Sequence, residues 1–248
     1  MPSLAQDLYM IPFKLVEGVI YVIISVIILK RNKKQLLNQI YFISILGWGI
    51  YIFLDMILYP LAHFETSYFS TITINSTEWV SPMIANILRD IALISAGALP
   101  IGFLYASIIL KYGKAHAIKP KIVFTLLLLY FLFVIPTIIF DLTIRSGDFV
   151  KSYFNIGSGL MILAQIVIFL IGIVYLVQLY LKFKDALMKK SIRHLILGSS
   201  LLLAGIVFFL LVGFMNISAY AAITGPIGHL MWMVGAIFIY KGIIAPGN

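Results

Sequence analysis

The sequence predicts an all-α polytopic membrane protein, a bundle of about seven transmembrane helices with its N-terminus outside the cell and its C-terminus in the cytoplasm. The composition, the apolar runs and the placement of the basic residues lead to this prediction. Of the 248 residues, 62% are hydrophobic and only 11% are charged. A soluble domain averages about half apolar and a quarter charged residues. A chain of this composition therefore needs lipid as its solvent, and we expect it in the cell membrane.

Seven apolar runs are long enough to cross a bilayer, whose hydrocarbon core of about 30 Å requires about 20 helical residues. The predicted spans cover roughly residues 10–29, 39–61, 81–110, 121–140, 157–181, 195–215 and 222–244. The third run contains Pro100 and the fourth contains Pro136, so we expect a kink or a tilt in each of these helices. Together the spans are predicted to form a single transmembrane domain over residues 1–248.

Basic residues gather on one side of these spans. Of the 18 Lys and Arg residues, 14 lie in or beside the loops after the first, third and fifth spans, or at the end of the seventh: Lys30, Arg31, Lys33, Lys34, Lys111, Lys114, Lys119, Lys121, Lys182, Lys184, Lys189, Lys190, Arg193 and Lys241. Cytoplasmic loops are enriched in Lys and Arg, which gives the predicted orientation. The same placement argues against nucleic-acid binding. The basic residues that give the net charge of +9 lie in the loops, where they determine the orientation of the helices and contact anionic lipid headgroups.

The sequence contains no convincing catalytic motif, and we expect neither an enzyme nor a resident cofactor or metal. The absence of cysteine excludes disulfides, Cys-ligated zinc, iron–sulfur clusters and a thiol nucleophile. The four histidines show no metal-ligand spacing. The last span has its lysine, Lys241, at the cytoplasmic end rather than in the middle, where retinal proteins carry their Schiff base.

Polar residues inside the spans are the candidates for function. An ionisable group is costly at bilayer depth, so it usually faces the bundle interior and has a partner. Counted from the predicted outer ends of the spans, these groups fall in the outer half of the membrane, and spacings of three and four place several of them on common helix faces. The predicted ligand-binding residues are Glu17, Asp55, Tyr59, Arg89, Asp90, Gln165, His229 and Trp232.

A structural interpretation stays open for each of these residues. Lys14 and Glu17 stand three residues apart and can pair with each other. Arg89 can pair with Asp55 and hold the second and third helices together. Asp55 and Asp141 lie near enough to the interface to be hydrated.

Small residues recur at helix-packing spacing on two spans: Ala98, Gly102 and Ala106 on the third, and Gly198 and Gly205 on the sixth. Such rows permit close contact between helices. We expect them to serve packing within the bundle, with dimerisation through one of these faces as the alternative.

Two segments carry a resemblance to a known family. The stretch Asn86–Tyr112, NILRDIALISAGALPIGFLYASIILKY, has Arg89 early, small residues, Pro100 and an aromatic-bearing end, and the tail Tyr240–Pro246 combines an aromatic residue, glycine and proline. With seven spans and the N-terminus outside, these features resemble the seven-helix N-terminal membrane sensor region of bacterial and archaeal histidine kinases and related signalling proteins. The chain departs from that pattern because no kinase, receiver or cyclase sequence follows the last span. The resemblance therefore implies a sensor module whose output needs a separate partner protein.

We therefore predict a receptor- or sensor-like protein with a polar cavity that is open to the outside. It is expected to bind a small polar or anionic molecule there, to contact membrane lipids, and to signal through a partner protein or a homodimer. Arg89 would pair with an anionic group of the ligand. The expected counter-ions are Glu17, Asp55 or Asp90, and the expected walls are Tyr59 and Trp232. A small-solute or ion transporter is the second interpretation, and a structural membrane subunit is the third.

Overall fold

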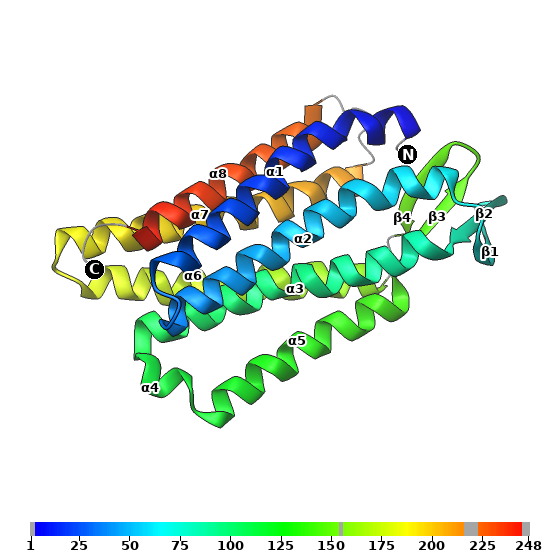
Figure 1. Ribbon diagram of the computed structural model, residues 1–248. Coiled ribbons are helices and arrows are strands. Elements are labelled where there is room, and N and C mark those ends of the chain that lie inside the picture. Colours follow the sequence, from blue (N-terminus) through cyan, green and yellow to red (C-terminus); the bar gives the residue numbers. More distant parts are fainter. Residues whose placement is uncertain (1–2, 154–155, 216–222, 245–248) are drawn as a thin grey trace.

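The computed structural model describes residues 3–153, 156–215 and 223–244, and most of them are helical (Figure 1). Within these ranges, seven helices are long and apolar enough to cross a membrane. They are α1 (Leu4–Arg31), α2 (Leu36–Phe64), α3 (Met83–Tyr112), α5 (Pro120–Phe140), α6 (Ile156–Lys182), α7 (Ala186–Met215) and α8 (Gly225–Ile244). A single turn, α4 (Lys114–Ala117), joins α3 to α5. The chain is therefore a multi-pass membrane protein of mostly helical structure.

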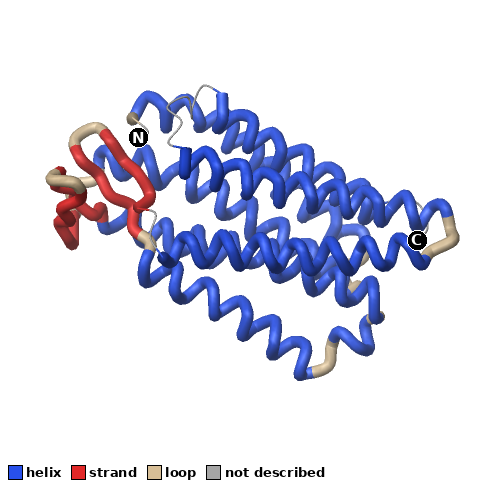
Figure 2. Tube along the Cα trace, turned by 180° about the vertical axis from the view of Figure 1, so that it is seen from behind, coloured by secondary structure: helices blue, strands red, loops and turns tan. Residues whose placement is uncertain are grey.

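Four strands depart from the all-α prediction. β1 (Tyr68–Ile74) and β2 (Thr77–Pro82) connect α2 to α3, and β3 (Leu142–Ser146) and β4 (Phe149–Tyr153) follow α5. They form one antiparallel sheet in the order β1-β2-β3-β4. Figures 1 and 2 show this sheet at one end of the bundle, beside the start of α1. We call this the sheet end, and we call the opposite end, where the α6–α7 connection lies, the basic end.

The local sequence explains both hairpins. Threonine and isoleucine alternate along β1, which is typical of strands with one face buried. Asn75 and Ser76, between β1 and β2, both have positive φ values of 50° and 61°. Two consecutive positive φ values fit the two-residue turn that closes a tight hairpin. Gly147 turns the second hairpin with a φ of 54°, where a residue without Cβ avoids steric strain.

Several helices extend beyond the predicted spans. Helix α1 has 28 residues, or about 42 Å at 1.5 Å per residue, which exceeds the hydrocarbon core. Helix α7 begins at Ala186 instead of residue 195, because the basic residues that the sequence analysis assigned to a loop form its first turns. Helices α3 and α5 continue through Pro100 and Pro136.

The small residues lie where helices approach closely, as the packing interpretation predicts. A Cβ on Gly102 of α3 would lie 1.6 Å from Oγ of Ser44 on α2. A Cβ on Gly198 of α7 would lie 2.7 Å from the backbone oxygen of Gly235 on α8. Larger side chains at these positions would separate the helices, so the two glycines set the distances α2–α3 and α7–α8.

Candidate functional site

Within the described residues, four buried acid–base pairs join the helices in the half of the bundle nearer the sheet end. The pairs are Asp7–His63, Lys14–Asp55, Glu17–His229 and Arg89–Asp141. We refer to these eight residues as the polar ladder. Every pair joins residues from different helices, or a helix and the end of another, so the ladder contributes to how the bundle is held together.

Helix α1 provides one member of three pairs. Its Asp7, Lys14 and Glu17 stand at spacings of seven and three residues, which places them on one side of the helix. Nε2 of His63 lies 2.8 Å from Oδ2 of Asp7, and Nζ of Lys14 lies 2.6 Å from Oδ2 of Asp55. Helix α1 is thus held to α2 at two levels and to α8 at a third.

These partners differ from the pairs that the sequence offered. Lys14 pairs with Asp55 rather than with Glu17, and Arg89 pairs with Asp141 rather than with Asp55. Asp141 is 3% exposed and Asp55 is 8% exposed, so both carboxylates are enclosed by protein instead of being hydrated at an interface. Each helix is oriented so that these side chains face a neighbouring helix. There the oppositely charged partner takes the place of the water that would hydrate the group at an interface.

Arg89 connects four elements. Its Nε donates to Oδ2 of Asp141 at 3.1 Å, and its Nη2 donates to the same oxygen. Its Nη1 donates to the hydroxyl of Tyr59 on α2 at 3.0 Å. The other carboxylate oxygen of Asp141 accepts from Ser152 of β4 at 3.1 Å. Because Asp141 stands between α5 and β3, the guanidinium links α2, α3, the end of α5 and the sheet.

Glu17 and His229 form the pair nearest the middle of α1. Glu17 is fully buried, and its Oε2 is bonded to Nδ1 of His229, which is 2% exposed. The rings of Trp48 and Trp232 meet edge to face beside this pair, with centroids 5.1 Å apart. Among the described residues, Oε1 of Glu17 and Nε1 of Trp48 make no hydrogen bond of standard geometry, although the two side chains interact with each other. A buried polar centre is therefore enclosed by aromatic rings.

The other predicted residues have different positions. Tyr59 contacts Arg89 directly, and Nζ of Lys14 lies 5.2 Å from its ring centroid. Trp232 stacks edge-on to His229, with centroids 5.5 Å apart. Asp90 is half-buried beside Arg89, and Gln165 is buried on α6, but within the described ranges neither belongs to one of the four pairs.

The predicted ligand-binding residues did not include four members of the polar ladder: Asp7, Lys14, His63 and Asp141. Asp7 lies before the first predicted span and His63 after the second, so the depth argument did not apply to them. The sequence did offer one signal for Asp7. It stands seven residues before Lys14, and this spacing places the two side chains on one face of α1.

Helix ends at the sheet end are capped by two charged residues. Nη1 of Arg145, in β3, donates to the backbone oxygens of Ala62, His63 and Glu65, at 3.1, 2.7 and 3.1 Å. These carbonyls lie at the C-terminus of α2, where no further helical turn supplies donors. The Glu65 carboxylate accepts from the backbone N–H groups of Ile84 and Ala85 at 2.6 and 3.0 Å, at the start of α3. The sheet and the ends of α2 and α3 are thereby tied together.

Asn86 adds a second connection between α3 and the sheet. Its Nδ2 donates to Oγ of Ser81, to the Pro82 oxygen and to the Thr143 oxygen, at 3.0, 2.7 and 3.1 Å. Its Oδ1 accepts from the backbone N–H of Thr143 at 2.6 Å. This buried amide uses both its donor and its acceptor on β2 and β3, so α3 and the sheet form one connected unit.

At the polar ladder, the described residues form no metal centre, and the predicted outer cavity is not seen among them. In residues 3–153, 156–215 and 223–244, no group of three or more His, Asp or Glu residues could hold a metal ion. A cavity of about 250 Å³ among the described residues lies instead at the basic end, over α6 and α7. The predicted ligand cavity at the sheet end therefore stays a prediction.

No family model, no curated protein and no solved structure matches this chain. The resemblance to the membrane sensor region of histidine kinases thus has no family match to support it, and it stays a prediction. The seven long apolar helices place the chain among seven-helix membrane proteins.

Proposed function

We propose that this multi-pass membrane protein is a receptor-like sensor in which a small anionic molecule competes with Asp141 for the guanidinium of Arg89. The observation that supports this proposal is the position of Arg89, which is buried, charged and paired with one carboxylate. A buried arginine needs a counter-ion. A carboxylate or phosphate group of a ligand can serve as well as Asp141, because the guanidinium donates strong hydrogen bonds to the oxygens of either group.

Replacement of Asp141 by a ligand at Arg89 would also change contacts outside the site. Asp141 joins α5 to β3, and its second oxygen accepts from Ser152 of β4. A ligand that takes Arg89 releases this carboxylate, and the sheet and α5 lose one of their connections to α3. Since Arg145 and Glu65 tie the same sheet to α2 and α3, a change at Asp141 reaches several helices. The output is proposed to pass to a separate partner protein.

Thermal unfolding of the purified protein in detergent, with and without a panel of amino acids, carboxylates, sugars and lipids, tests the proposal. A ligand at 100 times its Kd should stabilise the protein by about 2.7 kcal/mol. Arg89→Gln should abolish this shift. Asp141→Asn should lower the ligand concentration that gives half of the shift, because the competing carboxylate loses its charge.

Asp55→Asn is the matched control, because it removes a buried carboxylate of the ladder that does not contact Arg89. It should destabilise the protein but leave the half-maximal ligand concentration unchanged. If Arg89→Gln retains every ligand-induced shift, or if Asp141→Asn and Asp55→Asn alter ligand affinity equally, Arg89 is not the ligand's partner.

Ion or small-solute transport is the second candidate, favoured by the centre at Glu17. A buried carboxylate bonded to a histidine is the type of group that relays protons in membrane proteins. Proteoliposomes with an imposed pH gradient would then show proton flux that Glu17→Gln removes. A sensor alone shows no flux in either protein.

A further inference from the structure

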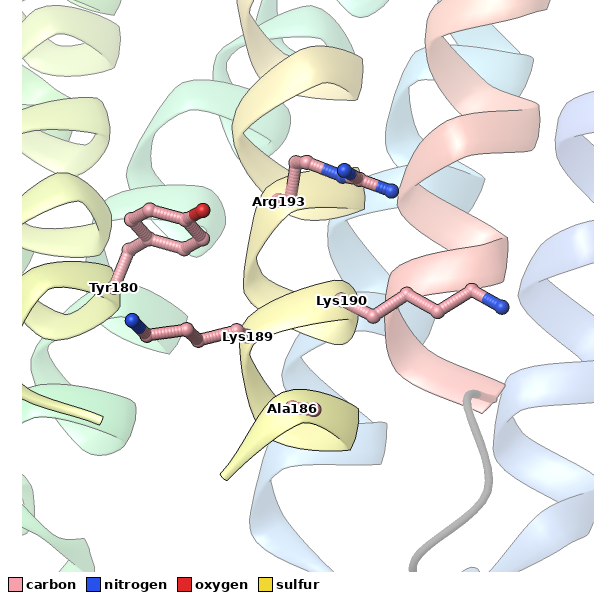
Figure 3. Close-up of a pocket in the computed structure, with 5 residues that line it drawn as sticks. All are labelled: Tyr180, Ala186, Lys189, Lys190 and Arg193. Carbon is pink, nitrogen blue, oxygen red and sulfur yellow. The ribbon is translucent and has the colours of Figure 1, made fainter. Parts of the chain in front are cut away.

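A shallow hollow at the basic end is formed mainly by one face of α7. Its volume is about 250 Å³, and it is lined by Ala186, Lys189, Lys190 and Arg193 of α7 and by Tyr180 of α6. The four α7 residues stand at i, i+3, i+4 and i+7, which places them on one side of the helix. We call this the basic hollow. Figure 3 shows Lys189 extending toward Tyr180 on one side of α7, and Lys190 and Arg193 extending to the other side.

The positive charges of the basic hollow are not compensated within the part of the chain that the structure describes. No salt bridge involves Lys189, Lys190 or Arg193 there. Lys189 is half-buried, with Nζ 5.4 Å from the ring centroid of Tyr180. The acid closest in sequence, Asp185, uses Oδ1 to accept from the backbone N–H of Met188 and so caps the start of α7. Three cations that line one hollow without a salt-bridge partner among the described residues favour an anionic ligand.

The size of the basic hollow limits what the anion can be. A volume of 250 Å³ corresponds to about eight water molecules at about 30 Å³ each. This space holds a phosphate group with a small alcohol. It is below the range of about 300–1,000 Å³ that is usual for drug-sized ligands. Arginine and lysine together provide several N–H donors to phosphate oxygens, and the Tyr180 hydroxyl can provide one more.

The surroundings of the basic hollow favour a lipid as the source of the phosphate. Helix α7 has 30 residues, or about 45 Å, so its first turns extend beyond a hydrocarbon core of about 30 Å into the headgroup layer. Apolar side chains beside the hollow are exposed in the structure: Leu181 is 73% exposed, Leu187 53% and Met188 43%. Acyl chains can cover these side chains while the headgroup occupies the hollow.

We propose that the basic hollow is a binding site for the phosphate headgroup of an anionic phospholipid. The site is built on α7 and α6 at the end opposite the polar ladder, so it does not depend on the proposed sensor function. It also explains why the basic residues form helical turns of α7 with a common face, in place of a loop.

Native mass spectrometry of the full chain released from detergent micelles provides the test. Phosphatidylglycerol, phosphatidylcholine and soluble glycerol phosphate are titrated separately, and the bound fraction is measured for each. Lys189→Gln/Lys190→Gln/Arg193→Gln removes the three cations of the hollow. The control Lys114→Gln/Lys119→Gln/Lys121→Gln removes the same charge from exposed residues around α4.

We expect one phosphatidylglycerol to bind in preference to phosphatidylcholine, and soluble glycerol phosphate to bind far more weakly than either lipid. The hollow variant should lose roughly 100-fold in affinity for phosphatidylglycerol, because it removes three charged groups that contact the headgroup phosphate directly. The control should lose less than about tenfold, because its cations do not contact the phosphate in the hollow. Equal losses in both variants, or equal binding of the two lipids, would overturn the proposed site. Binding of glycerol phosphate as tight as that of phosphatidylglycerol would overturn the lipid as its source.

Discussion

Lys14 and Asp55 are the pair that tests the polar ladder most directly. Nζ lies 2.6 Å from Oδ2, and the two side chains are only 6% and 11% exposed. Removing one partner of a buried pair costs about 3–5 kcal/mol, because the remaining charge is left without compensation. Replacing both by apolar residues is often neutral. We therefore expect Lys14→Met to lower the free energy of unfolding by about 3–5 kcal/mol, and Lys14→Met/Asp55→Leu to recover most of this loss.

The assay is unfolding of the purified protein in mixed micelles with increasing dodecyl sulfate, followed by far-UV circular dichroism. The single variants Lys14→Met and Asp55→Leu and the double variant complete a thermodynamic cycle. The coupling energy is the sum of the two single losses minus the loss of the double variant, and it is expected to be about 5 kcal/mol or more.

A second cycle distinguishes the structure from the alternative that the sequence allowed. If Lys14 paired with Glu17, three residues away on α1, then Lys14→Met and Glu17→Gln would be strongly coupled. With Lys14 held by Asp55 and Glu17 held by His229, the coupling between Lys14→Met and Glu17→Gln should be clearly smaller than the coupling between Lys14→Met and Asp55→Leu. A larger coupling with Glu17 than with Asp55, or a double variant no more stable than Lys14→Met alone, would refute the pairing argued here.

Two further predictions concern packing and buried amides in the same unfolding assay. Gly198→Ala places a methyl group 2.7 Å from the backbone of α8 and should cost about 1–3 kcal/mol. Gly18→Ala meets only a half-exposed phenyl ring on α2 that can rotate, so it should cost less than half as much, and equal costs would contradict the assigned helix contact. Asn86→Leu should cost about 1–3 kcal/mol, because it leaves a backbone N–H of β3 without its acceptor. Asn38→Leu, which removes a single side-chain bond of 3.3 Å, should cost clearly less, and the reverse order would contradict the role given to Asn86.

The candidate site was only partly predictable from the sequence. Glu17, Arg89 and His229 stood out because an ionisable group inside an apolar run has a high transfer cost, which depends on the residue and its position along the chain. Their partners could not be derived in that way. Asp141 attracts Arg89 only because α3 and the end of α5 meet, and His229 reaches Glu17 only because α8 lies beside α1.

The hairpins show a different limit. The alternation along β1 and the pair Asn75–Ser76 are present in the sequence, but no strand was predicted between the second and third spans. An isolated hairpin is marginal in water. Its stability depends on the neighbouring β3–β4 hairpin and on bonds such as those of Asn86, which join segments more than 50 residues apart.

The sequence by itself determined the membrane class and the number of long apolar helices, because hydropathy is a local property that adds up along the chain. It also located the basic residues, which predict the orientation. The tertiary structure decided the rotation of each helix, and with it the partners of Lys14 and Arg89. Those rotations follow from close contacts such as Gly102 against Ser44, and a contact of this kind depends on two segments at once. Pairing in a low-dielectric interior is therefore a property of the packed bundle rather than of any one helix.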